Sequence, residues 1–338
     1  MGVANEPSYA GVLNIFHEVA KKSLGLYPKL NNANTELLNY SENATYLVRD
    51  FANNKKYILR VNRPGYHTKE EIESELLWLK SINRDSPITV PLPFPGSNWE
   101  DVQEVHLHDE QSPFYCTLFA FLEGESPSEE NEQELIVQFE NLGEITAHLH
   151  NHSINWKPPQ TINRWSWDYE NVIGNDPIWG RWQDGKGITP QRLELFQKVS
   201  EVIKHRLDQY GKSNDRFGLI HADLRLPNLI IEDKVIKVID FDDCGFSWYM
   251  FDLATSLSFI EHQPYVPELI RAWVKGYRKV RPLSKQEEDE IPTFILMRRL
   301  MLIAWIGSHD NPTSQELGSK YTEQTDALAI RYLERFNL

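Results

Sequence analysis

The sequence is poor in several features that mark other classes of protein. Only two of its 338 residues are cysteines, Cys116 and Cys244, and their spacing suggests neither a metal-ligand pair nor a disulfide. Glycine and proline form no low-complexity tract, so the composition is that of a folded globular chain. No uninterrupted apolar run approaches membrane-spanning length, and the N-terminal residues do not resemble a signal peptide. We therefore expect a cytoplasmic protein with no membrane partner.

Positive charge is also scarce. Lysine and arginine total 35 against 49 aspartates and glutamates, which gives a formal net charge of −14. Nucleic-acid binding depends on clustered cations, so this balance disfavours a nucleic-acid partner. An acidic cleft would attract a cationic small molecule, such as an amine or amino alcohol, although acidity can also serve solubility alone. The length allows two lobes, each with its own core.

The most informative segment begins at His221. It reads H-A-D-L-R-L-P-N, and four residues separate Asp223 from Asn228, which is the spacing of the kinase catalytic loop H-R-D-L-x-x-x-N. Two short β-rich runs follow, residues 229–231 and 235–239, with the polar Glu232-Asp233-Lys234 between them, so they predict a tight hairpin. Strand pairing would bring Asn228 and Asp240 together at one end of this hairpin.

Phosphoryl transfer needs a carboxylate to orient the attacking hydroxyl and Mg²⁺ to neutralise phosphate charge. Asp223 is the candidate base, and Asn228 and Asp240 are the candidate Mg²⁺ ligands. Asp240 begins the triplet D-F-D, where a protein kinase has D-F-G. We expect His221 to be a buried imidazole that supports the loop through backbone hydrogen bonds. The alternative for the whole segment is an ordinary hairpin with solvated acidic ends.

The wider motifs indicate a family. The runs are L-I-H-A-D-L-R-L-P-N-L-I-I, V-I-D-F-D-D-C-G-F and Y-M-F-D-L-A-T-S-L-S-F. Together they resemble the aminoglycoside phosphotransferase and choline kinase family, and within it the bacterial branch of homoserine-kinase-type and stress-response kinases. The resemblance spans nearly the whole chain. Its motifs are specific for the fold and the nucleotide chemistry but not for the acceptor.

The resemblance implies a bilobal, protein-kinase-like α+β fold with ATP bound between the lobes. We expect a small, mostly antiparallel β N-lobe at residues 1–122 and a larger helical C-lobe at 123–338. Periodicity in the N-lobe predicts a helix over 9–22, strands over 36–40, 45–50 and 56–62, and a helix over 68–82. In the C-lobe it predicts a helix over 131–151 and three later helices, one of them covering 291–306.

Several N-lobe residues are candidates for nucleotide binding. Residues 41–44, including Ser41 and Asn43, occupy the place of a glycine-rich phosphate loop, yet G-x-G-x-x-G is absent, and a plain hairpin turn is an equal alternative. Arg60 stands where a kinase has its phosphate-binding lysine, unless it is an exposed strand-end cation. Glu75 is its expected partner, with Glu71 and Glu73 as competitors.

The hinge and the acceptor site are predicted less directly. Backbone groups from Ala120 to Leu122 resemble the family hinge that pairs with adenine, although a core strand would look similar. Residues 162–184 contain four tryptophans and several acids, a composition that suits a cationic acceptor but also a satellite core. The candidate acceptor contacts are Trp165, Trp167, Asp168, Asp242 and Trp305. His148, His150 and His152 cannot share one helix face, so we expect core or capping roles for them.

The sequence therefore predicts an ATP- and Mg²⁺-dependent transfer of the γ-phosphoryl group to a hydroxyl of a small acceptor. Aminoglycosides, amino alcohols and hydroxy amino acids all suit the scaffold. The chain runs from Asp243 almost directly into an apolar stretch, without a long activation segment or A-P-E, which favours a small acceptor over a peptide. A protein serine/threonine kinase and a silent nucleotide-binding regulator are the alternatives. Nothing in the sequence indicates an oligomeric state.

Overall fold

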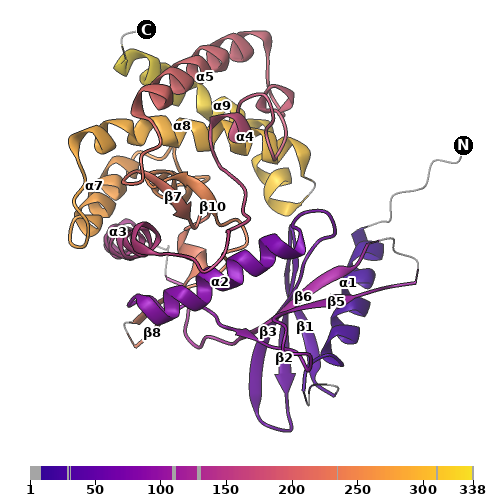
Figure 1. The fold of residues 1–338 in the computed structure, drawn as a ribbon. Coiled ribbons are helices and arrows are strands. Elements are labelled where there is room, and N and C mark those ends of the chain that lie inside the picture. Colours follow the sequence, from indigo (N-terminus) through magenta and orange to yellow (C-terminus); the bar gives the residue numbers. More distant parts are fainter. Residues whose placement is uncertain are drawn as a thin grey trace, which may run out of the picture. The chain divides into compact units, whose positions relative to one another are not determined.

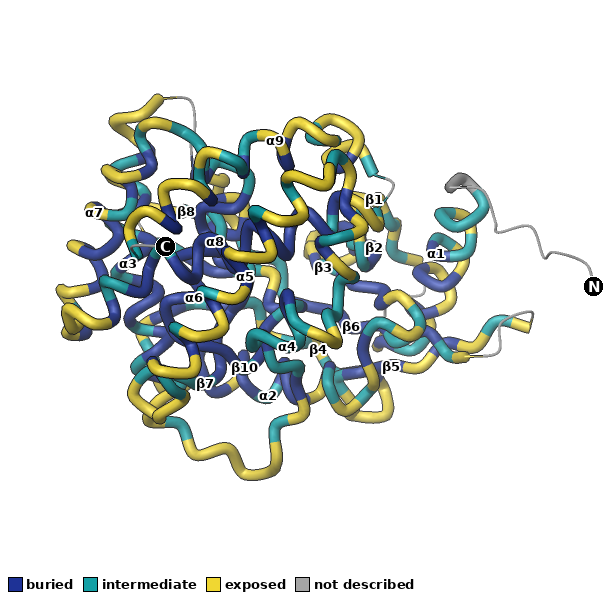
Figure 2. The backbone as a smooth tube through the Cα atoms, turned by 90° about the horizontal axis from the view of Figure 1, so that it is seen from above, coloured by how far each residue is buried: buried dark blue, intermediate teal, exposed yellow. Residues whose placement is uncertain are grey.

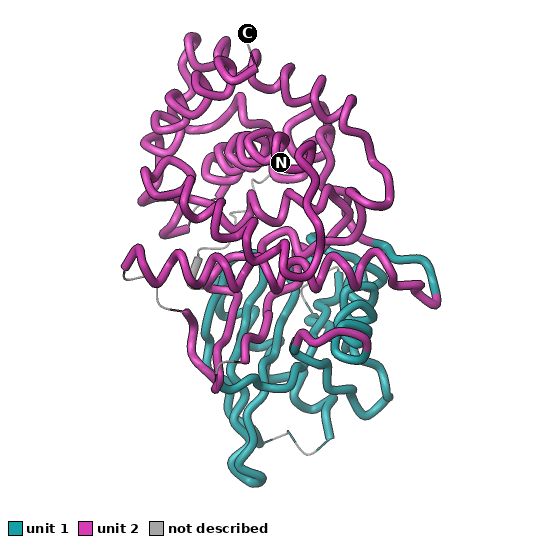
Figure 3. The backbone as a smooth tube through the Cα atoms, turned by 90° about the vertical axis from the view of Figure 1, so that its left-hand side faces the viewer, with its two compact units in different colours: residues 1–84, 89–123, 160–163 teal, residues 85–88, 124–159, 164–338 magenta. Residues whose placement is uncertain are grey.

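The structure, a computed structural model, describes residues 9–28, 30, 32–108, 112–127, 131–233, 235–309 and 311–336. Lys234, in the predicted hairpin turn, lies outside these residues. The chain forms two compact units (Figure 3). Unit 1 comprises residues 1–84, 89–123 and 160–163, and unit 2 comprises residues 85–88, 124–159 and 164–338.

Unit 1 is built on an antiparallel sheet of six strands (Figure 1). The strand order is β1-β2-β3-β6-β4, and β5 also pairs with β6. The elements of the unit are α1 (Tyr9–Leu24), β1 (Asn34–Tyr40), β2 (Ala44–Asp50), β3 (Lys55–Val61), α2 (Lys69–Asp85), β4 (Pro93–Phe94), β5 (Val102–Val105) and β6 (Phe114–Ala120). The predicted helices and the first three strands are confirmed to within three residues at each end.

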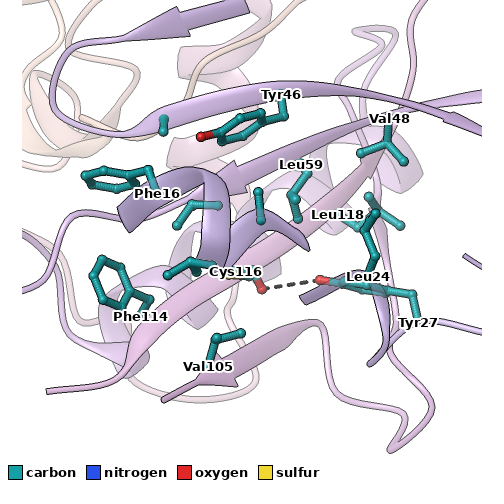
Figure 4. Close-up of a cluster of buried hydrophobic side chains, with 14 of the residues drawn as sticks. Phe16, Leu24, Tyr27, Tyr46, Val48, Leu59, Val105, Phe114, Cys116 and Leu118 are labelled. Carbon is teal, nitrogen blue, oxygen red and sulfur yellow. Dashed lines mark hydrogen bonds between the residues drawn. The ribbon is translucent and has the colours of Figure 1, made fainter. Parts of the chain in front are cut away.

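The core of unit 1 lies between α1 and the sheet (Figure 4). The apolar spacing of α1 places Phe16 and Val19 in this cluster, where they meet alternate residues of the strands, such as Leu59. Cys116 is part of the same cluster, and burial raises the pKa of its thiol to about 12. This cysteine is therefore a small core residue rather than a reactive thiolate.

Helix α2 places one glutamate on its buried side. Its start is capped reciprocally, because the Thr68 N–H donates to Glu71 (2.8 Å) and the Glu71 N–H donates to the Thr68 hydroxyl (3.2 Å). Four residues after Glu71, Glu75 falls on the same side as the buried Ile72 and Leu79. Glu73 is exposed on the other side of the helix. Of the three candidate glutamates, only Glu75 therefore has its carboxylate in the interior of unit 1.

Unit 2 is mainly helical. Its helices are α3 (Glu132–Asn155), α4 (Tyr169–Val172), α5 (Pro190–Tyr210), α6 (Phe251–Ser256), α7 (Val266–Tyr277), α8 (Lys285–Ser308) and α9 (Pro312–Arg335), with short 3-10 turns η1 (Trp182–Asp184) and η2 (Leu226–Asn228). Its strands are β7 (Phe217–Ile220), β8 (Leu229–Glu232), β9 (Val235–Val238) and β10 (Gly245–Trp248). The predicted helix over 131–151 extends to Asn155, and the three late helices are confirmed as α7, α8 and α9.

Two antiparallel ribbons hold the central segment of unit 2. β8 pairs with β9, as the sequence predicted, with Leu229 opposite Val238. β7 pairs with β10, with Ile220 opposite Gly245, a pairing that sequence reasoning missed. The two ends of the segment 221–244 are therefore held together by the pairing of β7 with β10. Within the segment, the hairpin of β8 and β9 adds a second pairing.

Helices α3 and α7 of unit 2 approach each other closely at two glycines. A Cβ added at Gly143 of α3 would clash with the Trp273 carbonyl of α7, and one added at Gly276 of α7 would clash with the Glu140 carbonyl of α3. Only residues without a side chain permit this spacing. The contact also brings His150 of α3 to the Tyr277 hydroxyl of α7, at 2.9 Å.

Among the described helices, one is long and apolar enough to cross a membrane, namely α8. Most of its apolar stretch is buried within the protein, as the core helix of a globular protein would be (Figure 2). Two arginines, Arg298 and Arg299, lie in the middle of this buried helix.

Candidate active site

His221 holds the loop that carries the candidate base. Its side chain is buried, Nε2 donates to the Ile239 carbonyl at 3.0 Å, and Nδ1 accepts the Asp223 N–H at 3.3 Å. Burial lowers the pKa of His221, although the nearby Asp252 opposes that shift. The ring is therefore neutral, with its proton on Nε2, and the predicted supporting role is confirmed.

Asp252 of α6 fixes the backbone just before the base. Its carboxylate accepts the N–H groups of Ala222 (2.7 Å) and His221 (3.3 Å) and contacts Nε2 of His150 (3.0 Å). Ala222 has a φ of 66°, a left-handed conformation that a residue with a side chain rarely adopts. The hydrogen bonds from the Ala222 and His221 N–H groups to Asp252 hold the backbone in this conformation. The core role expected for His150 is confirmed.

Asn228 joins the base to the hairpin. Its Nδ2 donates to the backbone carbonyl of Asp223 at 2.8 Å and to Oδ2 of the Asp223 carboxylate at 3.1 Å. The carbonyl of Asn228 accepts the Ile239 N–H at 2.9 Å, immediately before Asp240. The hairpin thus brings Asn228 and Asp240 to the same end, as its register predicted. Asp240 is exposed and also left-handed, with a φ of 64°.

Several carboxyl groups lie close together after the hairpin. The pKa of Asp243 is raised well above its usual value by burial and by the nearby carboxylates of Asp223, Asp242 and Asp240. A cation bound beside these carboxyl groups would favour their ionised forms and so lower this pKa. Asp242, predicted to contact the acceptor, is mostly buried here, and its backbone carbonyl accepts a hydrogen bond from Arg164.

The donors of this region suit Mg²⁺. With Nδ2 committed to Asp223, Asn228 would offer its amide oxygen, and Asp240 would offer a carboxylate oxygen. Among the described residues, no three His, Cys, Asp or Glu side chains form a ready-made metal cluster. Mg²⁺ does not require one, because it takes one or two protein oxygens and completes its shell with water and substrate phosphates.

Two arginines contact the candidate base, and sequence reasoning identified neither. Arg225 donates through Nε to both carboxylate oxygens of Asp223 (3.1 and 3.2 Å) and through one NH₂ to Oδ2 (3.1 Å). Arg298 of α8 donates to Oδ1 at 3.0 Å. Burial alone would raise the pKa of Asp223, but these two cations hold it below its usual value. The base is therefore ionised at neutral pH.

The tryptophan cluster is partly a structural core, which corrects the prediction for Trp167. This side chain is 1% exposed, and its indole N–H donates to the Asp243 carbonyl at 2.7 Å. The rings of Trp165 and Trp179 meet it edge to face, each at 5.4 Å. Trp167 thus supports the backbone at Asp243 and is too buried to contact an acceptor. Trp165, by contrast, is partly exposed.

Asp168 caps a helix and forms an ion pair. Its carboxylate caps the N-terminus of α4 by accepting the Asn171 N–H at 3.3 Å, and it pairs with Lys212 at 2.8 Å. A short polar residue before a helix prefers this role, and the sequence signal for it was present. Asp168 is therefore a capping residue, and its contact with an acceptor stays a prediction.

Trp305 of α8 is connected to the surroundings of the base by a chain of side-chain contacts. It is partly exposed, stacks on His309 at 4.8 Å, and lies 6.1 Å from the ring of Phe259. The Phe259 ring in turn lies 5.7 Å from the Arg225 guanidinium. The structure thus links Trp305 to the surroundings of Asp223, and its contact with an acceptor stays a prediction.

In unit 1, Arg60 and Glu75 form a two-point ion pair. The two guanidinium NH₂ groups meet the two carboxylate oxygens at 2.9 and 2.6 Å, and the side chains are 7% and 1% exposed. The alternative of an exposed strand-end cation is therefore wrong. Of the three glutamates considered, Glu75 is the partner, since Glu71 caps α2 and Glu73 is exposed.

The other candidate nucleotide-binding residues of unit 1 differ in their exposure and in whether their polar groups already have partners. Ser41 is exposed in the β1–β2 turn, whereas the buried Asn43 uses its side-chain oxygen to accept the Arg63 N–H at 3.0 Å. The Ala120 N–H donates to the Leu92 carbonyl at 2.9 Å, so this donor is not available to adenine. Leu122 lies just beyond β6 and is partly exposed.

Comparison with known proteins places the chain among phosphotransferases. Residues 35–283 match the phosphotransferase enzyme family. A solved microcompartment-associated aminopropanol kinase is 42% identical, with a TM-score of 0.86 over 94% of this chain and 98% of that one. The amicoumacin kinase of Bacillus subtilis strain 168 is 25% identical over 267 residues, which cover 76% of this chain and 75% of that protein.

A further match supports the fold alone. It is the amicoumacin kinase hAmiN, solved in complex with AMP-PNP, Ca²⁺ and Ami, at 20% identity and a TM-score of 0.75 over 94% of this chain and 95% of that one. The predicted kinase-like α+β fold and the family resemblance are confirmed by these matches. The chain belongs to the phosphotransferase enzyme family.

Proposed function

We propose that this protein transfers the γ-phosphoryl group of ATP to a hydroxyl of a small, amine-bearing acceptor, with amino alcohols as the favoured class. The observation that carries the proposal is the arrangement of Asp223, Asn228 and Asp240. A carboxylate base is hydrogen-bonded to an amide ligand, and a hairpin brings that amide beside a second carboxylate. The residues of this arrangement match the spacing of the kinase catalytic loop and its metal-binding aspartate.

Asp223 would accept the proton of the attacking hydroxyl. The acceptor oxygen forms a bond to the γ-phosphorus, the bond from that phosphorus to the bridging β,γ-oxygen breaks, and ADP leaves. Asp223 is suited to orient the hydroxyl, because its carboxylate is ionised and held by fixed donors. A weak base is sufficient, since orientation and charge stabilisation supply most of the rate in phosphoryl transfer.

Asn228 and Asp240 would hold Mg²⁺ with oxygen atoms. The ion, when bound, neutralises charge on the β- and γ-phosphates. Binding of the ion would also relieve the repulsion that raises the pKa of Asp243. The AMP-PNP and Ca²⁺ in the complex of hAmiN support a nucleotide and a divalent ion as the pair to test.

Residues 1–122 form the proposed nucleotide-binding lobe, and residues 123–338 the catalytic lobe. In the first, Arg60 would bind phosphate oxygens while Glu75 fixes its guanidinium. Arginine can meet phosphate at two points, which suits a fork already oriented by a carboxylate. Ser41 and the backbone near Leu122 are the remaining proposed contacts.

The acceptor class is supported by relatives and by chemistry. The 42% identical protein is an aminopropanol kinase, a name that specifies a small amino alcohol. The partly exposed rings of Trp165 and Trp305 offer the aromatic faces that a small ammonium group prefers. A large antibiotic is the competing class, in view of the more distant amicoumacin kinase.

The proposal is tested by ADP release from Mg-ATP with a panel of acceptors. The panel comprises 1-amino-2-propanol, ethanolamine, choline, homoserine and spectinomycin, and ³¹P NMR identifies the product. Asp223→Asn is the matched control, because it keeps the shape of the side chain and removes its basicity. We expect ADP and a phosphomonoester from an amino alcohol with the wild type only. The absence of any phosphorylated product across the panel would contradict the proposal.

A further inference from the structure

Helix α8 supplies a cation that nothing in the catalytic motif indicates. Arg298 lies 75 residues after Asp223 in the sequence, yet its NH₂ group donates to Oδ1 of that carboxylate at 3.0 Å. Its side chain is 3% exposed, whereas that of Arg225, the other arginine on the base, is 30% exposed. The two cations therefore differ in their freedom to leave the carboxylate.

Neighbouring side chains hold Arg298 in place. Its Nε donates to the Ser258 hydroxyl at 3.1 Å, and its guanidinium lies 5.2 Å from the centre of the Trp179 ring. The Ser258 hydroxyl itself donates to the carbonyl of Thr255, a residue of α6, at 2.7 Å. A planar guanidinium fixed at Nε and lying over a ring has few alternative positions. Arg298 is thus a rigid donor.

The donors around Asp223 leave little room for a hydroxyl. Oδ1 receives Arg298 and Arg225, and Oδ2 receives Arg225 and Asn228. A carboxylate offers about four acceptor positions, so an incoming hydroxyl must replace one of these donors. Arg225 is the donor that can withdraw, because it is the most exposed of the three and belongs to the loop itself.

We propose that Arg298 is a positioning residue that stays on Oδ1 of Asp223 during turnover and so presents Oδ2 to the acceptor hydroxyl once Arg225 has withdrawn. The inference rests on the proposed function. It predicts that Arg298 affects the rate of transfer and not the binding of nucleotide, because its contacts are with the base, Ser258 and Trp179.

The adjacent residue provides a matched control. Arg299 is also buried on α8, but it pairs with Glu261 at 2.6 Å and donates to Thr325 and Tyr321. Arg298→Lys and Arg299→Lys remove the same fork from the same helix while keeping a positive charge. A general loss of packing would affect both variants, whereas a positioning role would affect only the first.

Ser258→Ala removes the hydrogen bond to Arg298 with a small change in volume, so it tests the same idea in a variant that should fold. For each variant we measure kcat with 1-amino-2-propanol, KM for ATP, the Kd of Mg-ATP and the melting temperature. Because a shift of about 1 Å in a catalytic group can cost about 100-fold, we expect kcat to fall about 10- to 100-fold in Arg298→Lys. Ser258→Ala should lose about 2- to 10-fold in kcat by the same loosening of the carboxylate.

KM for ATP and the Kd of Mg-ATP should stay close to wild type in both variants, and Arg299→Lys should lower the melting temperature without a specific loss of kcat. In Arg298→Ala, added guanidinium ion should restore part of kcat, since it can refill the vacated donor position. Equal kcat in the two lysine variants, or no change in Arg298→Lys and Ser258→Ala, would overturn the role of Arg298 alone. A wild type that phosphorylates none of the acceptors would overturn the proposed function and this role with it.

Discussion

The ion pair between Arg60 and Glu75 permits a test that separates stability from nucleotide binding. Both side chains are almost completely buried, and the two short contacts between them form a closed fork. Glu75→Ala would leave the Arg60 charge in unit 1 without its carboxylate. Loss of one partner of a buried pair costs about 3–5 kcal/mol, whereas loss of an exposed pair costs less than about 1 kcal/mol.

A double variant, Arg60→Met with Glu75→Leu, removes both charges and fills their space with apolar atoms. Replacement of a buried pair in this way is often neutral or stabilising, so we expect most of the lost stability to return. If Arg60 binds phosphate, however, the double variant should bind Mg-ATP more weakly than the wild type does. A hydrogen bond to a charged group is worth about 1.5–3 kcal/mol, which corresponds to about 10- to 100-fold in Kd.

Urea denaturation followed by tryptophan fluorescence measures the stability, and the buried Trp78 of α2 contributes to that signal. Titration calorimetry with Mg-ATP measures the binding. A loss below about 1 kcal/mol in Glu75→Ala would refute the buried pair as an energetic unit. A double variant that binds Mg-ATP like the wild type would show that Arg60 is not the phosphate-binding cation.

Three further predictions concern unit 2. Asp223→Asn should lower kcat by about 10²- to 10⁴-fold, the range for loss of a general base, while calorimetry shows little change in Mg-ATP affinity. Asp240→Ala should abolish the Mg²⁺ dependence of ATP binding, and normal affinity in that variant would count against its ligand role. Burial lowers the pKa of His150, with Asp252 opposing, so its neutral form stabilises the fold above the ordinary pKa of 6.5. That contribution should be lost as the pH falls below 6.5, because the unfolded chain then binds a proton that the folded chain does not. Between pH 7.5 and 5.5, the urea midpoint of His150→Gln should therefore fall less steeply than that of the wild type.

Features set by short-range patterns could be predicted from the sequence. The hairpin of β8 and β9 follows from two β-rich runs and a polar turn, so the approach of Asn228 to Asp240 followed without coordinates. The pairing of Glu75 with Arg60 was expected from the resemblance to kinases. Helical spacing explains it, because of the three glutamates considered only Glu75 shares the apolar side of α2. In both cases, neighbours in the sequence determine which way a side chain points.

Features that depend on distant segments could not be predicted in the same way. Arg298 lies within an apolar helix whose periodicity indicates only burial, and its contact with Asp223 depends on how α8 packs on α6. Trp167 is a core residue because its indole reaches the carbonyl of Asp243, a partner 76 residues away. The capping role of Asp168 is different, because a short polar residue just before a helix indicates a cap from the sequence alone.

The close glycine contact of α3 and α7 makes the enzyme vulnerable to mutations remote from its chemistry. Even an alanine at Gly143 or Gly276 would push these helices apart and draw the Tyr277 hydroxyl away from His150. The disturbance would then reach Asp252, which holds the strained Ala222 beside the base. Inactivating substitutions in a random-mutagenesis screen should therefore recur at these two glycines, although neither lies in the catalytic motif.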